Sequence, residues 1–241
     1  MLKVNLIRRL IGAFVITIAL GVGHAASADP ILPGFDLFGT QPGTFATIPN
    51  VGTVLFMGGQ PLIPGTNVDT IVERLQGIDP FPVGGSGTIQ IILRELSLQS
   101  IAPVNINGTL FNIFATADPN QTTGTMTVFH SAVNGGIFSS ILPVNALLTF
   151  TPVGGGMSFT MNFQTTLMAD CVWSHTPPPN YPVGSRPSGG FYPVVGQCVE
   201  KAPEHAHVVA PAVPEPTTLL LLGSGLTGIA GFCRKRLSRK T

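Results

Sequence analysis

The chain has 241 residues, of which 12 are Lys or Arg and 11 are Asp or Glu, so that 10% of it is charged. Ordinary globular proteins have about a quarter of their residues charged. This scarcity excludes a coiled coil, a charged disordered protein and a nucleic-acid-binding protein that relies on a basic surface. The formal net charge of +1 averages unlike segments, because most cations lie near the two ends and residues 29–213 carry four bases and ten acids.

The first 28 residues have the three parts of a secretory signal peptide. Three basic residues precede the thirteen uncharged residues 10–22, and Ala26 and Ala28 then supply the small side chains that signal peptidase reads. A helix of thirteen residues rises about 20 Å, which is short of the roughly 30 Å hydrocarbon core of a bilayer. We therefore expect residues 1–28 to direct export through the Sec translocon and to be removed after Ala28.

The last segment has a second targeting pattern, with three parts in a fixed order. These are Pro214, Glu215 and Pro216, the uncharged residues 217–233, and the basic Arg234, Lys235 and Arg236. Seventeen residues in a helix span about 25 Å, the lower end of what a bilayer needs. Basic residues after such a helix keep the tail in the cytoplasm. Residues 217–233 are thus expected to form one transmembrane helix, and a plain C-terminal anchor is one interpretation of it.

The complete order closely resembles the PEP-CTERM sorting signal of Gram-negative bacteria, over residues 213–241. The resemblance implies that a membrane-embedded cysteine transpeptidase, the exosortase, recognises Pro214, Glu215 and Pro216 and removes the tail. These three residues would then be recognition residues and not catalytic ones. The protein would be anchored in the inner membrane only transiently, before its release to the cell surface or an exopolysaccharide matrix. We assign residues 214–241 to this signal.

Residues 29–200 are expected to form one exported domain of the all-β class. Runs rich in Ile, Val, Phe and Thr alternate apolar with polar residues, which is typical of antiparallel sheets with one buried face. Gly and Asn, the residues of tight turns, separate several of these runs. The runs are 53–57, 88–98, 109–116, 124–129, 137–142, 146–152 and 157–168. We expect an antiparallel β-sandwich, with a barrel as the second choice.

One stretch of this domain, residues 67–75, is ambiguous. Val68, Ile71, Val72 and Leu75 follow helical spacing, and Asn67 is a suitable N-cap. The same stretch is also compatible with an irregular strand, which we favour.

Residues 174–213 have a different composition. Six prolines between residues 177 and 193 favour an extended, polyproline-like chain, so we expect a Pro-rich loop over 174–197. Residues 201–213 are rich in Ala, Pro and Val and are expected to be a tether. Such a tether would let a processing enzyme in the membrane reach the Pro-Glu-Pro motif without unfolding the domain.

Cys171 and Cys198 are the only cysteines of the exported part. An even pair outside the cytoplasm usually forms a disulfide, here closing a 28-residue loop and contributing roughly 3–4 kcal/mol in the chain-entropy model. The alternative is a nucleophilic Cys171 with His175 as its base. A Pro-bounded loop does not hold a base in place, so we favour the disulfide.

Other candidate sites are weak, and we expect no metal, no cofactor and no catalytic residues. Glu204, His205 and His207 could ligate a metal, but they lie in the expected tether, where ordering them for binding is costly. His130 stands alone at a strand end and is interpreted as a turn or surface residue. Acids that could pair for glycoside hydrolysis are Asp36, Asp69, Glu73, Asp79, Glu95, Asp118 and Asp170.

Three functions follow from these patterns, in decreasing order of preference. The first is a non-enzymatic surface or matrix protein associated with exopolysaccharide, as in a biofilm, with exosortase and signal peptidase as its processing partners. The second is a carbohydrate-binding module that would need an exposed aromatic platform. The candidates for that platform are Trp173, Tyr181, Phe191 and Tyr192, which could equally be hydrophobic plugs under the Pro-rich loop. The third is a secreted hydrolase.

Overall fold

The computed structural model describes residues 29–79, 82–179, 181–199 and 209–211, and the regular structure within them consists of strands alone. In chain order the strands are β1 (Gly34–Thr40), β2 (Phe45–Ile48), β3 (Gly52–Gly58), β4 (Thr70–Arg74), β5 (Ser86–Ser100), β6 (Val104–Ile106), β7 (Thr109–Ala117), β8 (Gly124–Ala132), β9 (Gly135–Pro152), β10 (Phe159–Ser174), β11 (Tyr192–Val199) and β12 (Val209–Pro211).

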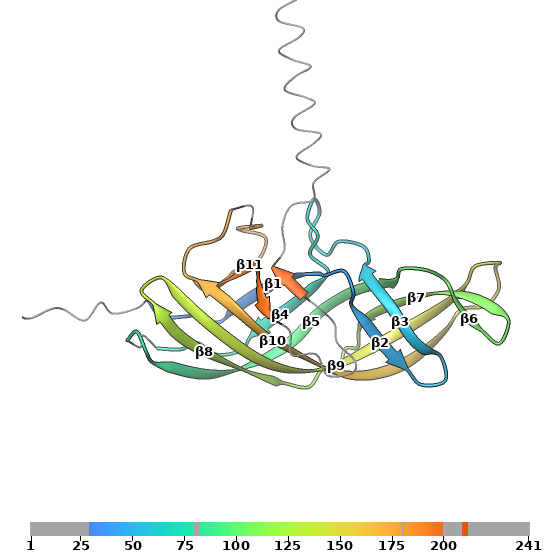
Figure 1. Ribbon diagram of the computed structural model, residues 1–241, viewed down its shortest axis with the longest axis horizontal. Coiled ribbons are helices and arrows are strands. Elements are labelled where there is room, and N and C mark those ends of the chain that lie inside the picture. Colours follow the sequence, from blue (N-terminus) through green and yellow to red (C-terminus); the bar gives the residue numbers. More distant parts are fainter. Residues whose placement is uncertain (1–28, 80–81, 180, 200–208, 212–241) are drawn as a thin grey trace, which may run out of the picture.

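Every pairing between these strands is antiparallel. The main path of the sheet runs β11-β10-β9-β7-β5-β4-β1-β12, and β2, β3, β6 and β8 branch from it (Figure 1). The all-β antiparallel class predicted from the alternation is therefore confirmed. The choice between a sandwich and a barrel stays a prediction.

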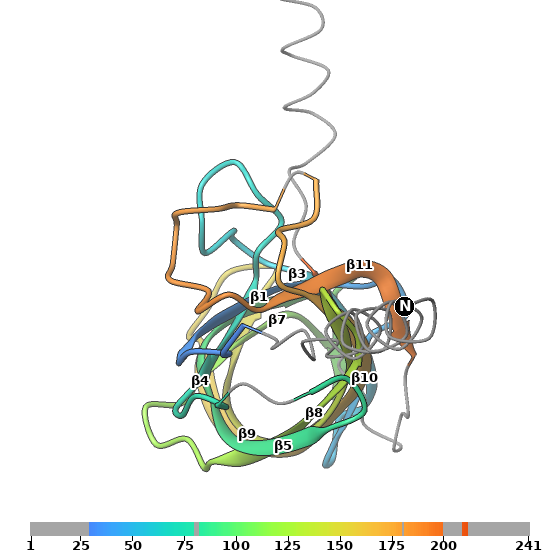
Figure 2. The ribbon, with the colours of Figure 1, turned by 90° about the vertical axis from the view of Figure 1, so that its left-hand side faces the viewer.

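Two long strands each pair with one neighbour over their first part and with another over their last part, and this change of partner curls the sheet. One edge of β9 pairs with β8 from Gly135 to Ile141 and with β7 from Ala146 onward. In the same way β5 pairs with β8 in its first half and with β7 near its end. Figure 2 shows the strands following one another around a common interior. At the far ends of the sheet, β12 pairs with β1 and also lies beside β11.

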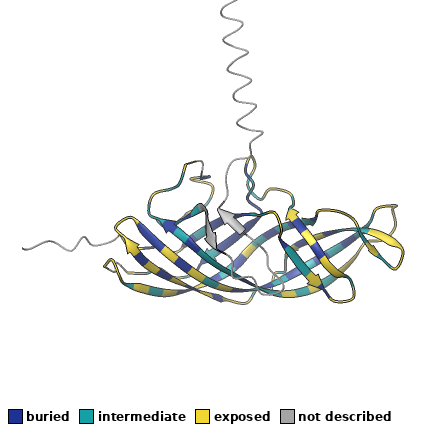
Figure 3. Cartoon of the chain, viewed as in Figure 1, coloured by how far each residue is buried: buried dark blue, intermediate teal, exposed yellow. Residues whose placement is uncertain are grey.

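Burial alternates along the strands (Figure 3). The buried hydrophobic side chains form one main core. In β9, Val144, Ala146, Leu148 and Phe150 are buried and the residues between them are partly exposed. In β5 the alternation shifts from odd to even positions at Arg94, where the register with β4 also skips a residue. This irregularity is a β-bulge, which lets one strand follow the curvature of the sheet.

The ambiguous stretch forms strand β4, as favoured. Its helix-like spacing arises because both faces of the strand are buried. Val72 belongs to the main core, whereas Ile71 packs on the outer side in a second cluster with Leu37, Val68 and Tyr181. Residues of the loops 59–69 and 175–191 cover this outer face. The strand therefore lacks the exposed polar face by which an alternating sequence pattern would identify it.

The C-terminal part of the described chain differs from the expected loop and tether. Strand β11 begins at Tyr192, inside the predicted Pro-rich loop, and contains Pro193 opposite Trp173. Proline is tolerated there because β10 is its one ladder partner in the described residues, as on an edge strand. Strand β12 lies inside the predicted tether and pairs with β1. The stretch between a sheet strand and Pro214 is thereby shortened to residues 212 and 213.

We expect Gly136→Ala to destabilise the fold. A Cβ at Gly136 would lie 1.9 Å from the carbonyl oxygen of Phe129 and 2.8 Å from the nitrogen of Ser131, at the irregularity between β8 and β9. Both are backbone atoms and cannot rotate away, so the free energy of unfolding should fall by about 1–3 kcal/mol or more. Gly154→Ala is the control, because nothing lies within 4 Å of its Cβ position. Equal urea midpoints for the two variants would contradict the described register.

Candidate functional site

A buried ion pair lies where β1 and β4 run side by side. Arg74 is 0% exposed and Asp36 is 1% exposed, and the distance from Arg74 Nε to Asp36 Oδ1 is 3.2 Å. Arg74 Nη1 donates to the carbonyl oxygen of Leu32 at 2.8 Å, and Nη2 donates to that of Ser188. One guanidinium thus joins β4 to β1, to the segment before β1, and to the loop before β11.

An aromatic row packs on this guanidinium. The Arg74 Cζ lies 4.7 Å from the ring centre of Phe191, a cation–π contact. Phe191 stacks on Trp173 at 5.0 Å with 15° between the rings, and His175 meets Trp173 edge-on at 4.8 Å. His175 Nδ1 also lies 2.8 Å from the carbonyl oxygen of Gly190. The row fills the sheet interior where the two ends of the sheet meet.

The predicted aromatic platform is not formed. Trp173 and Phe191 are buried in the main core, and Tyr181 is buried in the outer cluster. Tyr192 is half-buried and packs edge-on against Tyr181, with 5.1 Å between ring centres. These side chains take the alternative role of plugs under the Pro-rich loop, because the loop lies over them and excludes solvent. They offer no flat exposed surface for stacking a sugar ring.

The interpretation of His130 as a surface residue is wrong. His130 lies in β8, is 1% exposed and stacks at an angle on Trp173 with 5.9 Å between ring centres. Its ring is an extension of the aromatic row. Sequence patterns do not reveal this contact, because His130 of β8 and Trp173 of β10 are far apart along the chain.

The acids considered for hydrolysis are largely engaged in structural contacts. Asp69 Oδ2 accepts from the backbone nitrogen of Thr40 at 2.8 Å and its Oδ1 accepts from Thr70 Oγ1 at 2.9 Å. Glu73 pairs with Arg94, and Glu95 pairs with Arg186 on the loop before β11. Burial is the main cause that raises the pKa of Asp36 to about 6 and also raises the pKa of Asp69.

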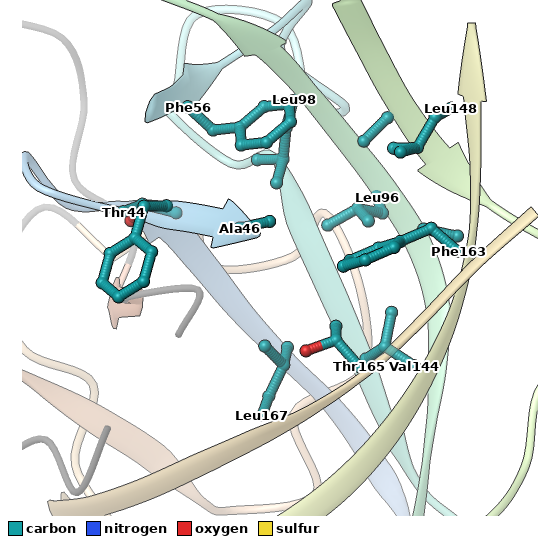
Figure 4. A pocket seen from close by; sticks show the side chains of 13 residues that line it. Thr44, Ala46, Phe56, Leu96, Leu98, Val144, Leu148, Phe163, Thr165 and Leu167 are labelled. Carbon is teal, nitrogen blue, oxygen red and sulfur yellow. The ribbon is translucent and has the colours of Figure 1, made fainter. Parts of the chain in front are cut away.

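An apolar cavity lies between β2 and the inner faces of β5, β7, β9 and β10 (Figure 4). Its volume is about 40 Å³, and its walls include Phe56, Leu98, Val144 and Phe163. A single water needs about 10–15 Å³ of such volume. The cavity therefore has room for a few small groups at most, and a bulky apolar ligand would have to displace the core.

A second, polar cleft is larger, with a volume of about 200 Å³. It lies on the outer side of β9 and β10, beside the loop that follows β7. Its walls include Asp118, Asn120, Asn145, Asn162 and Gln164. Among these residues, Asp118 is the one that the sequence analysis names as a candidate site residue. Their one signal is a concentration of Asn and Gln in segments otherwise rich in Thr and apolar residues.

Backbone register places Cys171 and Cys198 opposite each other. Cys171 in β10 pairs with Cys198 in β11. Residues directly opposite in antiparallel strands have Cα atoms about 4.5–5.5 Å apart, which lies within the range that a disulfide requires.

Several predicted sites lie outside the described residues. They are Ala26 and Ala28, the possible metal ligands Glu204, His205 and His207, the motif Pro214, Glu215 and Pro216, and the basic Arg234, Lys235 and Arg236. Within the described ranges no group of three metal-ligating side chains occurs. No helix of membrane-spanning length and apolarity occurs in those ranges either, and the predicted span 217–233 lies beyond them.

Comparison with known protein families gives a match to the C-terminal segment. The family model of the PEP-CTERM protein-sorting motif matches residues 212–236. The chain therefore carries a PEP-CTERM protein-sorting motif in its C-terminal segment. The motif implies exosortase-dependent sorting of an exported protein, as the resemblance predicted. No curated protein and no solved structure matches the chain.

The match begins directly after β12. The last described strand therefore leads into the sorting motif, and β12 is held to β1 by the pairing of Phe38, Gly39 and Thr40.

We expect Arg74→Met to lower the free energy of unfolding at pH 7 by about 3–5 kcal/mol, because it leaves the buried Asp36 without its ion-pair partner. Arg94→Met is the matched control. The Arg94 side chain is 46% exposed in its pair with Glu73, and such exposed pairs contribute about 1 kcal/mol or less. Urea unfolding of both variants tests this. Similar losses would show that the Arg74 contacts are not the main connection at this end of the sheet.

Asp36 should make the stability of this protein fall as pH rises. Because its pKa is about 6 when folded, and 3.8 is its ordinary value, the folded state binds more protons between these values. The free energy of unfolding should therefore fall by up to about 3 kcal/mol from pH 4 to pH 6.5.

The comparison variant is Asp36→Asn, measured by urea unfolding over the same pH range. Asp69 contributes in the same direction and is present in both proteins, so the difference between the two slopes isolates Asp36. Parallel pH profiles for the two proteins would refute the assignment.

Proposed function

We propose that this protein is a non-enzymatic exported protein that an exosortase sorts, and cleaves, at its C-terminal motif. The observation that carries the proposal is the PEP-CTERM match over residues 212–236. In this proposal the Sec translocon and signal peptidase act first on residues 1–28. The protein is then held transiently in the inner membrane by residues 217–233, and after cleavage it stays at the cell surface or in an exopolysaccharide matrix.

The structural roles of the acids support a non-enzymatic domain. A glycosidase needs two carboxyl groups facing one bond, about 5–10 Å apart. Asp36, Glu73 and Glu95 are instead each paired with an arginine. Asp118 accepts a hydrogen bond from the backbone of Asn120 at 2.7 Å, which is the geometry of a turn. These contacts also make a secreted hydrolase the weakest of the three functions.

A disulfide between Cys171 and Cys198 is part of the proposal, and the register of β10 and β11 supports it. The bridge would join two strands of which β11 is held to the sheet by few ladder pairs. It would therefore hold the Pro-rich loop in place over the aromatic row. Outside the cell the bond would persist, because no cytoplasmic reductant reaches it.

Intact mass of the protein recovered from the native extracellular fraction tests the proposal. We expect a chain that starts at Asp29, ends near Pro214 and gains two mass units on reduction. Glu215→Ala should leave the tail in place, so that the chain still ends at Thr241 and stays with the membrane.

Glu204→Ala is the matched control, because Glu204 is an acid in the same part of the chain but outside the matched segment. It should be processed like the natural protein. A natural protein that retains Thr241 would identify the tail as an ordinary anchor and overturn the exosortase step.

A further inference from the structure

The polar cleft arises where β9 changes partner. Its pairing with β8 ends at Ile141 and its pairing with β7 begins at Ala146, so the backbone of Asn145 has no ladder partner on that edge. The loop 118–123, which joins β7 to β8, fills this gap. Asn145 therefore bonds to the loop instead of to a strand.

The loop is held in one position by a set of short contacts. Asp118 N and Gln121 Nε2 both donate to the carbonyl oxygen of Asn145, at 2.9 and 2.5 Å. Asn145 N donates to Gln121 Oε1 at 3.1 Å, and Asn145 Nδ2 donates to the carbonyl oxygen of Asn120 at 2.5 Å. The wall of the cleft is thus preorganised, which reduces the entropic cost of binding a ligand.

Three amide side chains are available on this wall. Asn120, Asn162 and Gln164 are exposed, and none of them makes a side-chain hydrogen bond within the described residues. Gln164 lies directly opposite Asn145 in the β9–β10 register, and Asn162 is two residues away on the same face. Each amide offers two donors and two acceptor sites, so the cleft presents both kinds of group close together.

The side chains that line the cleft indicate which class of ligand it fits. No basic residue contributes to it, so an anionic ligand has no counter-charge. The single carboxylate is Asp118, whose Oδ1 already accepts from Asn120. Calcium prefers six to eight oxygen ligands, with several carboxylates among them. A neutral ligand whose groups both donate and accept, such as a sugar hydroxyl, matches the wall best.

We propose that the cleft binds a sugar residue of a neutral polysaccharide through the amides of Asn120, Asn162 and Gln164. Since a water needs about 10–15 Å³ of such volume, the 200 Å³ of the cleft hold roughly as many heavy atoms as one hexose. This inference does not rest on the sorting motif. It deepens the matrix association by naming a place and a ligand class for it, and it replaces the buried aromatic platform.

The test is affinity electrophoresis of the natural protein in native gels that contain dextran, galactomannan or mixed-linkage β-glucan. We expect retardation by at least one of these. In the double variant Asn162→Ala, Gln164→Ala, the affinity for that polysaccharide should fall about tenfold, because two hydrogen bonds to the sugar are lost. Gels with polygalacturonate, an anionic polymer, should not retard either protein.

Gln90→Ala is the control variant, because Gln90 is also an exposed amide on the outer face of the sheet, but lies in β5 and away from the cleft. It should bind like the natural protein, and thermal unfolding of all variants should be unchanged since none of the side chains is buried. Absence of retardation by all three neutral polymers, or equal retardation of the double variant, would overturn the proposal.

Failure here is separate from failure of the sorting proposal. The gel measures the exported domain whatever its termini are, and intact mass measures the termini whatever the domain binds. If the tail is retained, the same gels are run on the full chain in a neutral detergent.

Discussion

The contacts of Arg74 determine how the end of this sheet is closed. A buried guanidinium must satisfy its donors within the protein, because an unpaired buried charge is costly. Arg74 does so with Asp36, Leu32 and Ser188, which come from three different segments. The Pro-rich loop is therefore drawn onto β1. Arg186 on the same loop adds a second connection through Glu95 and lies over the ring of Phe35 at 5.3 Å.

This closure explains why the aromatic residues are buried. Because the loop is fixed over β1, Phe191 lies against the guanidinium, and Trp173 of β10 stacks on Phe191. A ring that is buried at such a position stabilises the fold by removing apolar area from water, whereas an exposed ring in a platform would not. Any ligand site of the domain consequently has to lie elsewhere, on the outer side of the sheet or in its loops.

Sequence reasoning succeeded where burial is one-sided and failed where it is not. Alternation identified β3, β5, β7, β8, β9 and β10, because each has one core face. It divided β9 into two runs and was ambiguous at β4, which is buried on both faces. It missed β1, β2, β6, β11 and β12. At β11 the reason is that prolines usually end strands. The partners of Arg74 were invisible because they lie up to 114 residues away. The Asn and Gln side chains of the cleft carry no spacing that sequence alone would recognise.

The C-terminal motif and the domain that precedes it give different kinds of information about the protein. The C-terminal motif implies exosortase-dependent sorting, and it matches a family model over residues 212–236. The domain before it matches neither curated proteins nor solved structures, so its role must come from its own geometry. In that geometry, the curl of the sheet and the polar cleft have one origin, the change of pairing partner along β9. This change curls the sheet and also leaves the backbone of Asn145 without a strand partner on that edge, so that it binds the loop that forms the cleft. A polar surface site is thus built by the same constraint that shapes the core, and it stays exposed when the other end of the sheet is closed by the loop.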